Sequence, residues 1–386
     1  MANNHLHIVS FDIPFPADYG GVMDVFYKVK ALHEAGISIT LHCFQYRDRH
    51  PQAELEKYCT KVYYYKRDIS PLSMAHSFAT GIPFIVTSRM KRGLLKTLKV
   101  DNDPILFEGI HTCGYINNDA LKNRLKIIRM HNVEWEYYHN LELLENGLAK
   151  KAYFKTESIK LKQYENDILK YANFILPISP ADDEYYKQLY EKKNLDENTI
   201  RYIPPFHPNK QVEIKTGTGE YALFHGKLSV SDNEQAAIYL INKVFSKLEI
   251  PLIIAGKEPS ETLKQIVLRY ENVKLIANPA EKEMNDLIQN AQINVLVSFQ
   301  RSGMKLKLLN ALYRGRFCIV NRHTIQNTGL ESLCIVKNTS KEIGAAIESF
   351  MNVQFSQKAM LDRREILEKG FSNGENAQKI VEILRG

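Results

Sequence analysis

The segment best suited to bind a phosphate lies between two apolar runs, 293–297 and 317–320. Ser302 and Gly303 follow the first run, and a glycine-free stretch then continues to Arg314. This order is typical of a strand, a crossover helix and a second parallel strand. The helix start would place free backbone N–H groups, a glycine and nearby lysines at the carboxyl end of a strand, which suits an anion.

Helical spacing gives this stretch two faces at about 100° per residue. The core face carries apolar residues: Met304, Leu308, Ala311 and Leu312. A stripe about 60° wide is small, basic and hydrogen-bonding, and it carries Gly303, Lys307, Asn310 and Arg314. An amphipathic helix with a merely solvated polar face explains the stretch equally well, so the segment alone leaves both interpretations open.

The first elements of the chain read as a βαβ unit of a parallel sheet. An apolar β-rich run, 5–11, leads through a proline-rich loop to Gly20 and Gly21. Apolar residues at helical spacing follow up to Gly36, and then another apolar run begins. A glycine pair is usually only a turn, but between a first strand and a first helix it is expected to face a ligand.

Two later strands end in polar residues that could do chemistry. Glu108 ends one predicted strand, with His111 three residues on, and His131 and Glu134 follow the next. Ligands of open α/β sheets bind at the carboxyl ends of strands, so these side chains are candidate site residues. Capping or core-satisfied side chains are the competing interpretation. The strands expected in this half after the first two are 61–65, 104–108, 126–130 and 174–177.

The second half repeats the strand–helix rhythm. The segment 202–219 has three prolines and two glycines and reads as an interdomain linker. Between the linker and 293–297 the expected strands are 221–225, 251–255 and 273–276, and helices are expected at 134–172, 233–248, 341–353, 356–369 and 374–384. The predicted fold class is α/β, with two doubly wound Rossmann-like domains facing a cleft.

Composition limits the class of protein and its partners. The 386 residues are 44% hydrophobic and 25% charged, without an apolar stretch of membrane-spanning length or a signal-peptide pattern at the start, so a cytoplasmic protein is expected. Five widely spaced cysteines indicate neither a disulfide framework nor a zinc site. A net charge of +7 is weak support for nucleic acid, which we do not expect as a partner. The basic segment 88–100 could touch the inner face of an anionic membrane or be a solvated helix face.

The chain resembles GT-B fold glycosyltransferases, and is most similar to the retaining enzymes of glycosyltransferase family 4. The resemblance covers nearly the whole length. It rests on the order and spacing of loose motifs, which are Gly20-Gly21, His131, Pro177-Ile178-Ser179, Ile203-Pro204-Pro205, Phe224-His225-Gly226-Lys227-Leu228 with Asn233, Ala255-Gly256, and Gly303-Met304-Lys305-Leu306-Lys307 leading to Ala311 and Gly315.

This resemblance implies three parts. Residues 1–205 would form the acceptor-side domain, residues 206–370 the nucleotide-sugar domain, and residues 371–386 a helix that packs back on the first domain. Gly20 and Gly21 would approach the donor diphosphate.

The resemblance also implies roles for individual residues. The family's paired cations map onto Lys227 and Asn233, and its two acids map onto Ser302 and Asn310, so three of these four positions lack the expected charge. Lys307 would restore the missing positive charge. Lys227 and Lys307 would stabilise the diphosphate, Asn310 would bind the ribose, and His131 would contact sugar or acceptor. Donor contacts are also expected from Gly226, Gly303 and Met304, and weaker acceptor contacts from Glu108 and Glu134.

The implied function is transfer of a hexose-type sugar from a nucleotide sugar, UDP-, GDP- or similar, to a saccharide or lipid-linked saccharide in polysaccharide biosynthesis. Retention of configuration and the absence of any metal or other cofactor are expected. The first alternative is a non-catalytic GT-B-like subunit that has lost donor binding, because charged motif positions are replaced. A sugar-nucleotide epimerase is a further alternative. A dinucleotide oxidoreductase is disfavoured, since no G-x-G-x-x-G follows the first strand.

Overall fold

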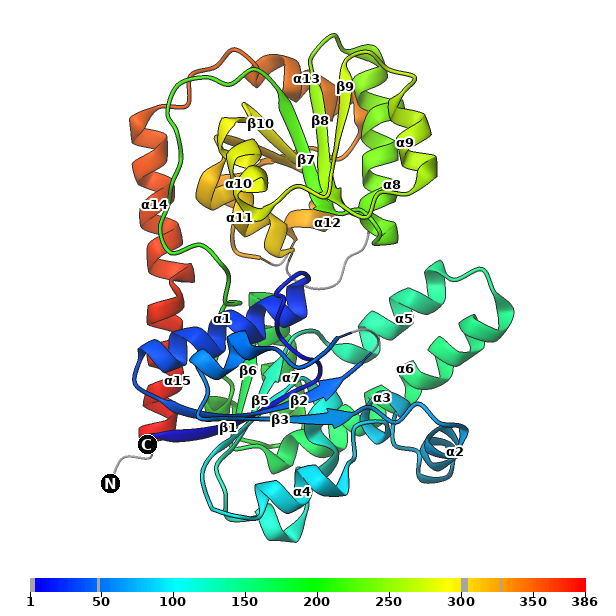
Figure 1. Ribbon diagram of the computed structural model, residues 1–386, viewed down its shortest axis with the longest axis vertical. Coiled ribbons are helices and arrows are strands. Elements are labelled where there is room, and N and C mark those ends of the chain that lie inside the picture. The colour runs from blue at the N-terminus through cyan, green and yellow to red at the C-terminus, as the bar shows by residue number, and fades with distance from the viewer. Residues whose placement is uncertain (1–3, 47–48, 300–304, 327) are drawn as a thin grey trace. The chain divides into compact units, whose positions relative to one another are not determined.

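The computed structural model describes residues 4–46, 49–299, 305–326 and 328–386. The chain divides into two compact units, Met1–Phe206 with Asn373–Gly386, and His207–Ser372 (Figure 1). Each unit holds a six-stranded sheet whose described strand pairs are all parallel. The predicted fold class, α/β with two doubly wound sheets, is confirmed.

The sheet of the first unit has the strand order β3-β2-β1-β4-β5-β6. Its strands are apolar on both faces, because parallel strands are covered by helices above and below. In β5, for example, Ile127 packs into one core and Ile128 into the other, as the two-residue period of a strand requires. The strands are β1 His5–Ser10, β2 Ser38–Gln45, β3 Lys61–Lys66, β4 Ile105–Glu108, β5 Lys126–Met130 and β6 Phe174–Pro177.

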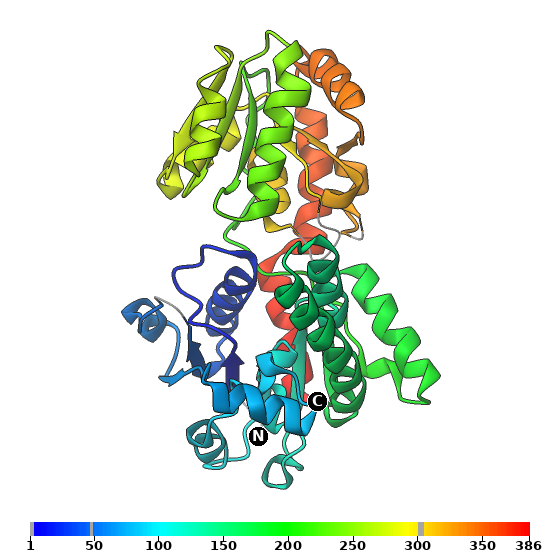
Figure 2. The same cartoon turned by 90° about the vertical axis from the view of Figure 1, so that its right-hand side faces the viewer.

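Two layers of helices cover this sheet. On one face α1 and α15 lie side by side and share a core with the strands, and on the other face α3, α4, α6 and α7 pack (Figures 1 and 2). The helices are α1 Gly20–Glu34, α2 Pro71–Thr80, α3 Phe84–Thr87, α4 Arg92–Leu98, α5 Glu134–Leu144, α6 Leu148–Ile168, α7 Pro180–Lys192 and α15 Asn373–Arg385.

The second unit has the strand order β12-β11-β10-β7-β8-β9. Helices α8, α9 and α13 pack on one face of its sheet, and α10 packs against the other. Its strands are β7 Ala222–Lys227, β8 Leu252–Lys257, β9 Val273–Ala277, β10 Ile293–Leu296, β11 Phe317–Val320 and β12 Ile335–Val336. Its helices are α8 Ser231–Tyr239, α9 Glu261–Val267, α10 Glu281–Asn290, α11 Leu306–Arg314, α12 Arg322–Ile325, α13 Ser340–Phe350 and α14 Gln357–Phe371.

Shorter helical turns complete the described elements. The single helix expected at 233–248 is instead α8 followed by a π-helical turn and a 3₁₀ turn, and the expected helical region 134–172 is two main helices separated before Gly147. The π turn is Leu240–Val244, and the 3₁₀ turns are Ala53–Lys57, Ile110–Tyr115, Asp119–Leu121, Leu169–Tyr171, Glu197–Thr199, Phe245–Lys247 and Glu331–Leu333.

The elements that were not predicted include β12 and α2. The edge strand β12 is only two residues long, too short for a periodic pattern. Helix α2 has no buried apolar stripe, and hence no helical hydrophobic period to detect. Among the described helices, none combines the length and apolar character that crossing a bilayer requires.

Candidate functional site

Lys307 reaches from helix α11 to the first turn of α8, the helix that follows β7. Its Nζ donates a hydrogen bond to Asn233 Oδ1 at 2.7 Å and lies 4.9 Å from the centre of the Phe224 ring. Helix α11 buries its leucine face, and this leaves Lys307 on the less buried stripe that the sequence predicts. The structure therefore brings together two of the predicted donor residues, Lys307 and Asn233.

Two glycines make room for this arrangement at the carboxyl ends of β7 and β8. A Cβ atom on Gly256 would lie 1.8 Å from the Gly226 carbonyl oxygen, so a side chain there is incompatible with this strand spacing. A Cβ on Gly226 would lie 3.2 Å from the Asn233 amide. That amide in turn donates from Nδ2 to the Lys227 carbonyl oxygen at 2.9 Å. Asn233 thus links the Lys227 backbone to the Lys307 side chain.

The Asp232 carboxylate opposes the effect of burial on two lysines of this site. Burial lowers the pKa of Lys307 to about 8, although the Asp232 carboxylate acts in the opposite direction. Burial also lowers the pKa of Lys305, again against the effect of Asp232. Burial, together with the Lys307 charge, lowers the pKa of His225 to about 3, so this imidazole is neutral. This site therefore combines a neutral histidine, His225, with two lysines, Lys305 and Lys307, whose charged forms are disfavoured by burial.

Asp232 ties this cluster to the end of β10. Its carboxylate accepts hydrogen bonds from Ser298 Oγ at 2.7 Å and from the Phe299 backbone N–H at 2.8 Å. Helix α8 begins at Ser231 with Val230 as its N-cap, so Asp232 lies in the first turn of this helix. Asp232 thus fixes Ser298 and Phe299, which follow β10.

The remaining predicted residues of the second unit are placed less favourably or lie outside the described residues. Lys227 Nζ is 3.9 Å from a carboxylate oxygen of Glu258. Asn310 turns toward the linker, where its Oδ1 accepts a hydrogen bond from Asn209 Nδ2 at 2.9 Å. In this conformation its oxygen is already used. The predicted donor residues outside the described residues are Ser302, Gly303 and Met304.

In the first unit, five side chains form a buried charge cluster: Asp24, Lys28, Glu108, Arg129 and His131. Lys28 Nζ lies 2.8 Å from Asp24 Oδ2 and 2.8 Å from Glu108 Oε1. Arg129 donates two hydrogen bonds to the Asp24 carboxylate, from Nε at 3.2 Å and from Nη2 at 2.9 Å. The His131 Nε2 atom lies 2.9 Å from Glu108 Oε2, so these two predicted residues are also brought together.

The charged side chains of the buried charge cluster pair with one another. Burial by itself would raise the pKa of Asp24, but the Arg129 guanidinium and the Lys28 ammonium outweigh it and hold that pKa well below its usual range. Asp24, Glu108 and His131 have the ligand types and spacing of a metal site. The Lys28 ammonium, however, already lies between the two carboxylates, where a metal ion would need to bind. This donor set therefore fits a lysine bridge better than a metal ion.

Glu134 and His111 belong to a neighbouring buried group around Phe11. Phe11 lies between His131 and His111, with ring centres 5.3 Å and 5.4 Å away. Burial raises the pKa of Glu134 to about 7, opposed by a hydrogen bond from Asn132. Burial holds the pKa of His111 well below its usual value. Glu134 is therefore a carboxyl group that can exchange a proton near neutral pH.

Gly20 and Gly21 open helix α1, as the strand–loop–helix pattern predicted. A Cβ on Gly21 would lie 2.8 Å from the end of the Phe11 ring, so packing alone already favours glycine there. No acidic residue lies in the first turn of α1 and no side chain caps its start. Its role toward a diphosphate remains a prediction.

Four residues that hold these sites were not predicted as site residues from the sequence: Asp24, Lys28, Arg129 and Asp232. Signals for three of them were present. Asp24 and Lys28 are charged residues four apart on the apolar stripe of α1, and Arg129 interrupts an apolar strand. A charge at such positions is almost never left buried without a partner.

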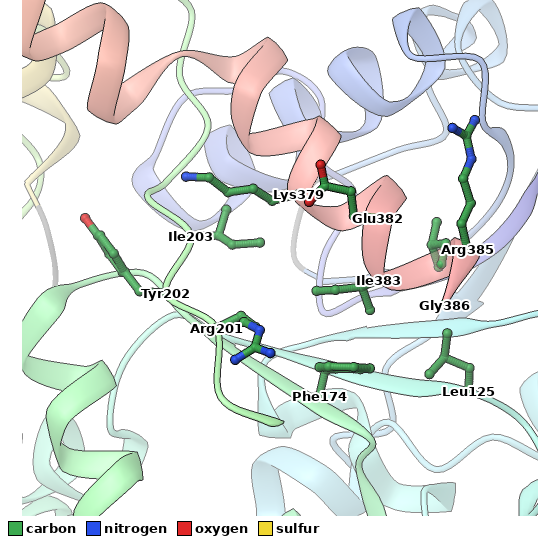
Figure 3. Close-up of a pocket in the computed structure, with 11 residues that line it drawn as sticks. Leu125, Phe174, Arg201, Tyr202, Ile203, Lys379, Glu382, Ile383, Arg385 and Gly386 are labelled. Atoms are coloured by element: carbon green, nitrogen blue, oxygen red, sulfur yellow. The ribbon is translucent and has the colours of Figure 1, made fainter. Parts of the chain in front are cut away.

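A pocket of about 610 Å³ lies elsewhere in the first unit, between α15 and the β6 edge (Figure 3). Lys379 and Glu382 of α15 face Arg201, Ile203 and Phe174 across it. The pocket borders the amino-terminal ends of β5 and β6, whereas His131 follows the carboxyl end of β5. None of the predicted site residues lines it.

Residues 219–352 match the family model described as glycosyl transferases group 1. This range contains every predicted donor residue of the second unit. The chain is also 28% identical over 338 residues to an uncharacterized 44.6 kDa protein in the cps region of Klebsiella pneumoniae, covering 83% of this chain and 84% of that protein.

Solved structures are similar over the full length at low identity. TarM of S. aureus, solved as a mutant with fondaparinux, alpha-GlcNAc-glycerol and UDP, matches with a TM-score of 0.68 at 10% identity, covering 99% of this chain and 100% of TarM. HepE of Anabaena, solved with UDP and glucose, matches with a TM-score of 0.63 at 10% identity, covering 98% and 99% of the two chains. At such identity the likeness shows a shared fold.

Proposed function

We propose that this chain, which has the GT-B fold and matches group 1 glycosyl transferases over most of its second unit, transfers a sugar from a nucleotide-sugar donor. The predicted resemblance to GT-B glycosyltransferases is confirmed at the level of fold and family match. The donor, the acceptor and the stereochemistry are parts of the proposal. UDP is the first candidate nucleotide, because HepE and TarM were both solved with UDP.

The observation that carries the proposal is the contact between Lys307 and Asn233. In the family that this chain resembles, a cation is expected at the position of Asn233. Here the Lys307 Nζ lies 2.7 Å from the Asn233 side chain, so a positive charge occupies nearly the same place from a different helix. A displaced charge of this kind supports retained diphosphate binding, which argues against a scaffold that has lost its donor site.

The proposed chemistry needs cations where the diphosphate leaves. As the donor sugar becomes oxocarbenium-like, negative charge grows on the diphosphate, and fixed positive groups lower that barrier. Lys307 supplies one such group and Lys227, at the end of β7, a second. Because burial disfavours the Lys307 ammonium, an anionic ligand that binds it would compensate its charge in a medium of lower dielectric than water.

Among the residues proposed to contact the acceptor, His131 has the best-defined orientation. Its ring is 8% exposed, and Glu108 fixes its Nε2 atom, so the rest of the imidazole edge is oriented by the buried charge cluster. Glu134, with a pKa near 7, is proposed to exchange a proton with an acceptor hydroxyl. Glu108 itself is fully buried and acts through His131.

The finer parts of the proposal follow the resemblance. Transfer would retain configuration, use a hexose-type donor and proceed without a metal. The acceptor would be a saccharide or a lipid-linked saccharide, at the cytoplasmic face of a membrane. A role in polysaccharide biosynthesis is supported by the cps region of the Klebsiella relative.

The proposal is tested by incubating the purified chain with UDP- and GDP-sugars and a bacterial glycolipid extract. Release of nucleoside diphosphate that depends on the extract, together with a glycosylated product, is the expected result. Product formed without any acceptor, as a changed sugar on the same nucleotide, would indicate an epimerase instead.

The pH dependence of donor use tests the role of Lys307. We expect kcat/KM for the donor to fall as the pH rises above about 8, because the free enzyme then loses the Lys307 ammonium. The fall should approach tenfold per pH unit. Lys307→Arg keeps its charge throughout this range and should remove the fall. A wild-type profile that stays flat to pH 9.5 would contradict the assignment.

A further inference from the structure

Helix α2 is a capped helix with almost no buried surface. Among its ten residues, Ser77 alone is buried. The Ser70 side chain caps its start, Pro71 occupies its first turn, and Gly81 ends it with a φ of 71°. A helix whose two ends are both capped is a well-defined part of the fold, so its exposure needs an explanation other than loose packing.

The exposed residues of α2 are apolar to an unusual degree. Leu72 is 83% exposed, Phe78 is 62% exposed and Met74 is 40% exposed, and Ile69 just before the helix is 64% exposed. Single exposed apolar side chains are ordinary, but several on one short helix mark an interaction surface. We define α2 with Ile69 as the apolar ridge.

The charges around the apolar ridge favour an anionic partner. No acidic residue occurs from Ile69 to Ile82. Lys160 of α6 holds the ridge in place: its Nζ lies 3.2 Å from Ser77 Oγ and 4.2 Å from the centre of the Phe78 ring. The acid nearest this lysine, Glu157, pairs with its Nζ through Oε1 at 3.2 Å and accepts a hydrogen bond from the Phe84 backbone N–H through Oε2.

Helix α6 carries further apolar and basic groups on its exposed face. Ile159, next to Lys160, is 62% exposed, and exposed Lys155 and Lys162 lie one turn to either side of it, with Lys162 Nζ 4.3 Å from the centre of the Trp135 ring. Lysines that flank apolar side chains can extend their ammonium groups to lipid phosphates while the apolar groups enter the interface. In Figure 1, α2 stands at the outer side of the first unit, beyond α3.

We infer that the apolar ridge and the lysines of α6 form a docking surface for a lipid bilayer with anionic headgroups. A helix of this length, about 15 Å, offers far less than the ~800 Å² per partner that a stable protein interface buries. A bilayer interface, in contrast, accepts one short helix. The surface goes beyond the proposed transferase activity, since it does not depend on the donor or the sugar.

For the basic segment 88–100 the sequence left both membrane contact and a solvated helix face open. Its Leu94 and Leu98 side chains belong to the core and are buried. Arg89 is buried as well, so the exposed cations of this segment are Arg92, Lys96 and Lys99. The apolar part of the docking surface comes from α2, about twenty residues earlier in the chain.

The test is flotation of the full chain with vesicles of phosphatidylcholine, with or without phosphatidylglycerol, in the absence of nucleotide and acceptor. The wild type should float with the anionic vesicles and less well with phosphatidylcholine alone. Leu72→Ser with Phe78→Ser should lower the partition coefficient at least tenfold, by the apolar burial lost. Leu268→Ser, at a leucine of the second unit that is 78% exposed, is the matched control and should bind as the wild type does.

Wild-type protein that stays with the aqueous phase, or a double variant that floats as well as the wild type, would overturn the inference. Sedimentation velocity without lipid tests whether a second copy of this chain, and not a bilayer, occupies the ridge. A wild-type dimer that the double variant abolishes would show that the ridge binds a second copy of this chain, and the lipid assignment would be wrong.

Discussion

Lys307→Ala is expected to lower donor turnover at least 100-fold. Losses of about this size follow when an enzyme loses one fixed group that stabilises a developing anion. The fold should survive. Since burial already depresses the pKa of Lys307, the folded protein holds its charge at a cost near neutral pH. The thermal midpoint of the variant should therefore equal or exceed that of the wild type. Initial rates with saturating acceptor and thermal unfolding measure both effects.

Two further variants separate the charge of Lys307 from its position. Lys274→Ala removes an exposed lysine of β9 in the same unit and should leave turnover unchanged. The exchange Asn233→Lys with Lys307→Asn moves the cation to the other side of the 2.7 Å contact and should restore part of the lost activity. Wild-type turnover in Lys307→Ala would refute the diphosphate role.

Lys28→Met is expected to destabilise the first unit by about 3–5 kcal/mol, because it leaves buried carboxylates without their shared cation. The methionine fits the space of the lysine stem but cannot bridge Asp24 and Glu108, which are both buried. The thermal midpoint should fall by about 10 °C. Lys61→Met, at an exposed lysine in β3, is the control and should change it by no more than ordinary surface substitutions do.

The sign of the effect can be checked with a second substitution and with pH. Glu108→Gln added to Lys28→Met removes the surplus negative charge, so the double variant should be more stable than Lys28→Met alone. The depressed pKa of Asp24 means that its ion pairs stabilise the fold above about pH 4 and are lost in acid. The difference in stability between wild type and Lys28→Met should therefore become smaller in acid. A double variant no more stable than the single one would contradict this account of the cluster.

The fold was readable from the sequence because both sheets are parallel and buried on two faces. Their strands appear as nearly continuous apolar runs, and the helices between them carry a helical period wherever they pack. β7, for instance, was expected at 221–225 and spans Ala222–Lys227. α2 was missed for the opposite reason: a helix that buries only Ser77 leaves no hydrophobic period to detect.

The candidate site was readable only in part. Spacing placed Lys307 on the hydrogen-bonding stripe of its helix, but a stripe does not tell which neighbour the side chain reaches. The contact with Asn233 joins residues 74 positions apart, and the one between His131 and Glu108 joins neighbouring strands. Such partners depend on strand order and on close approaches such as that between Gly226 and Gly256, which one sequence does not encode locally.

The most direct measurement for a nucleotide-sugar transferase is thermal unfolding of the wild type and of Lys307→Ala with UDP, GDP, ADP, CMP and dTDP in turn. A ligand at 100 times its Kd stabilises the native state by about 2.7 kcal/mol. We predict an upward shift of the wild-type midpoint with one nucleotide, UDP first, and its loss in Lys307→Ala. Cooperative unfolding with no shift for any nucleotide would contradict donor binding and favour the non-catalytic alternative.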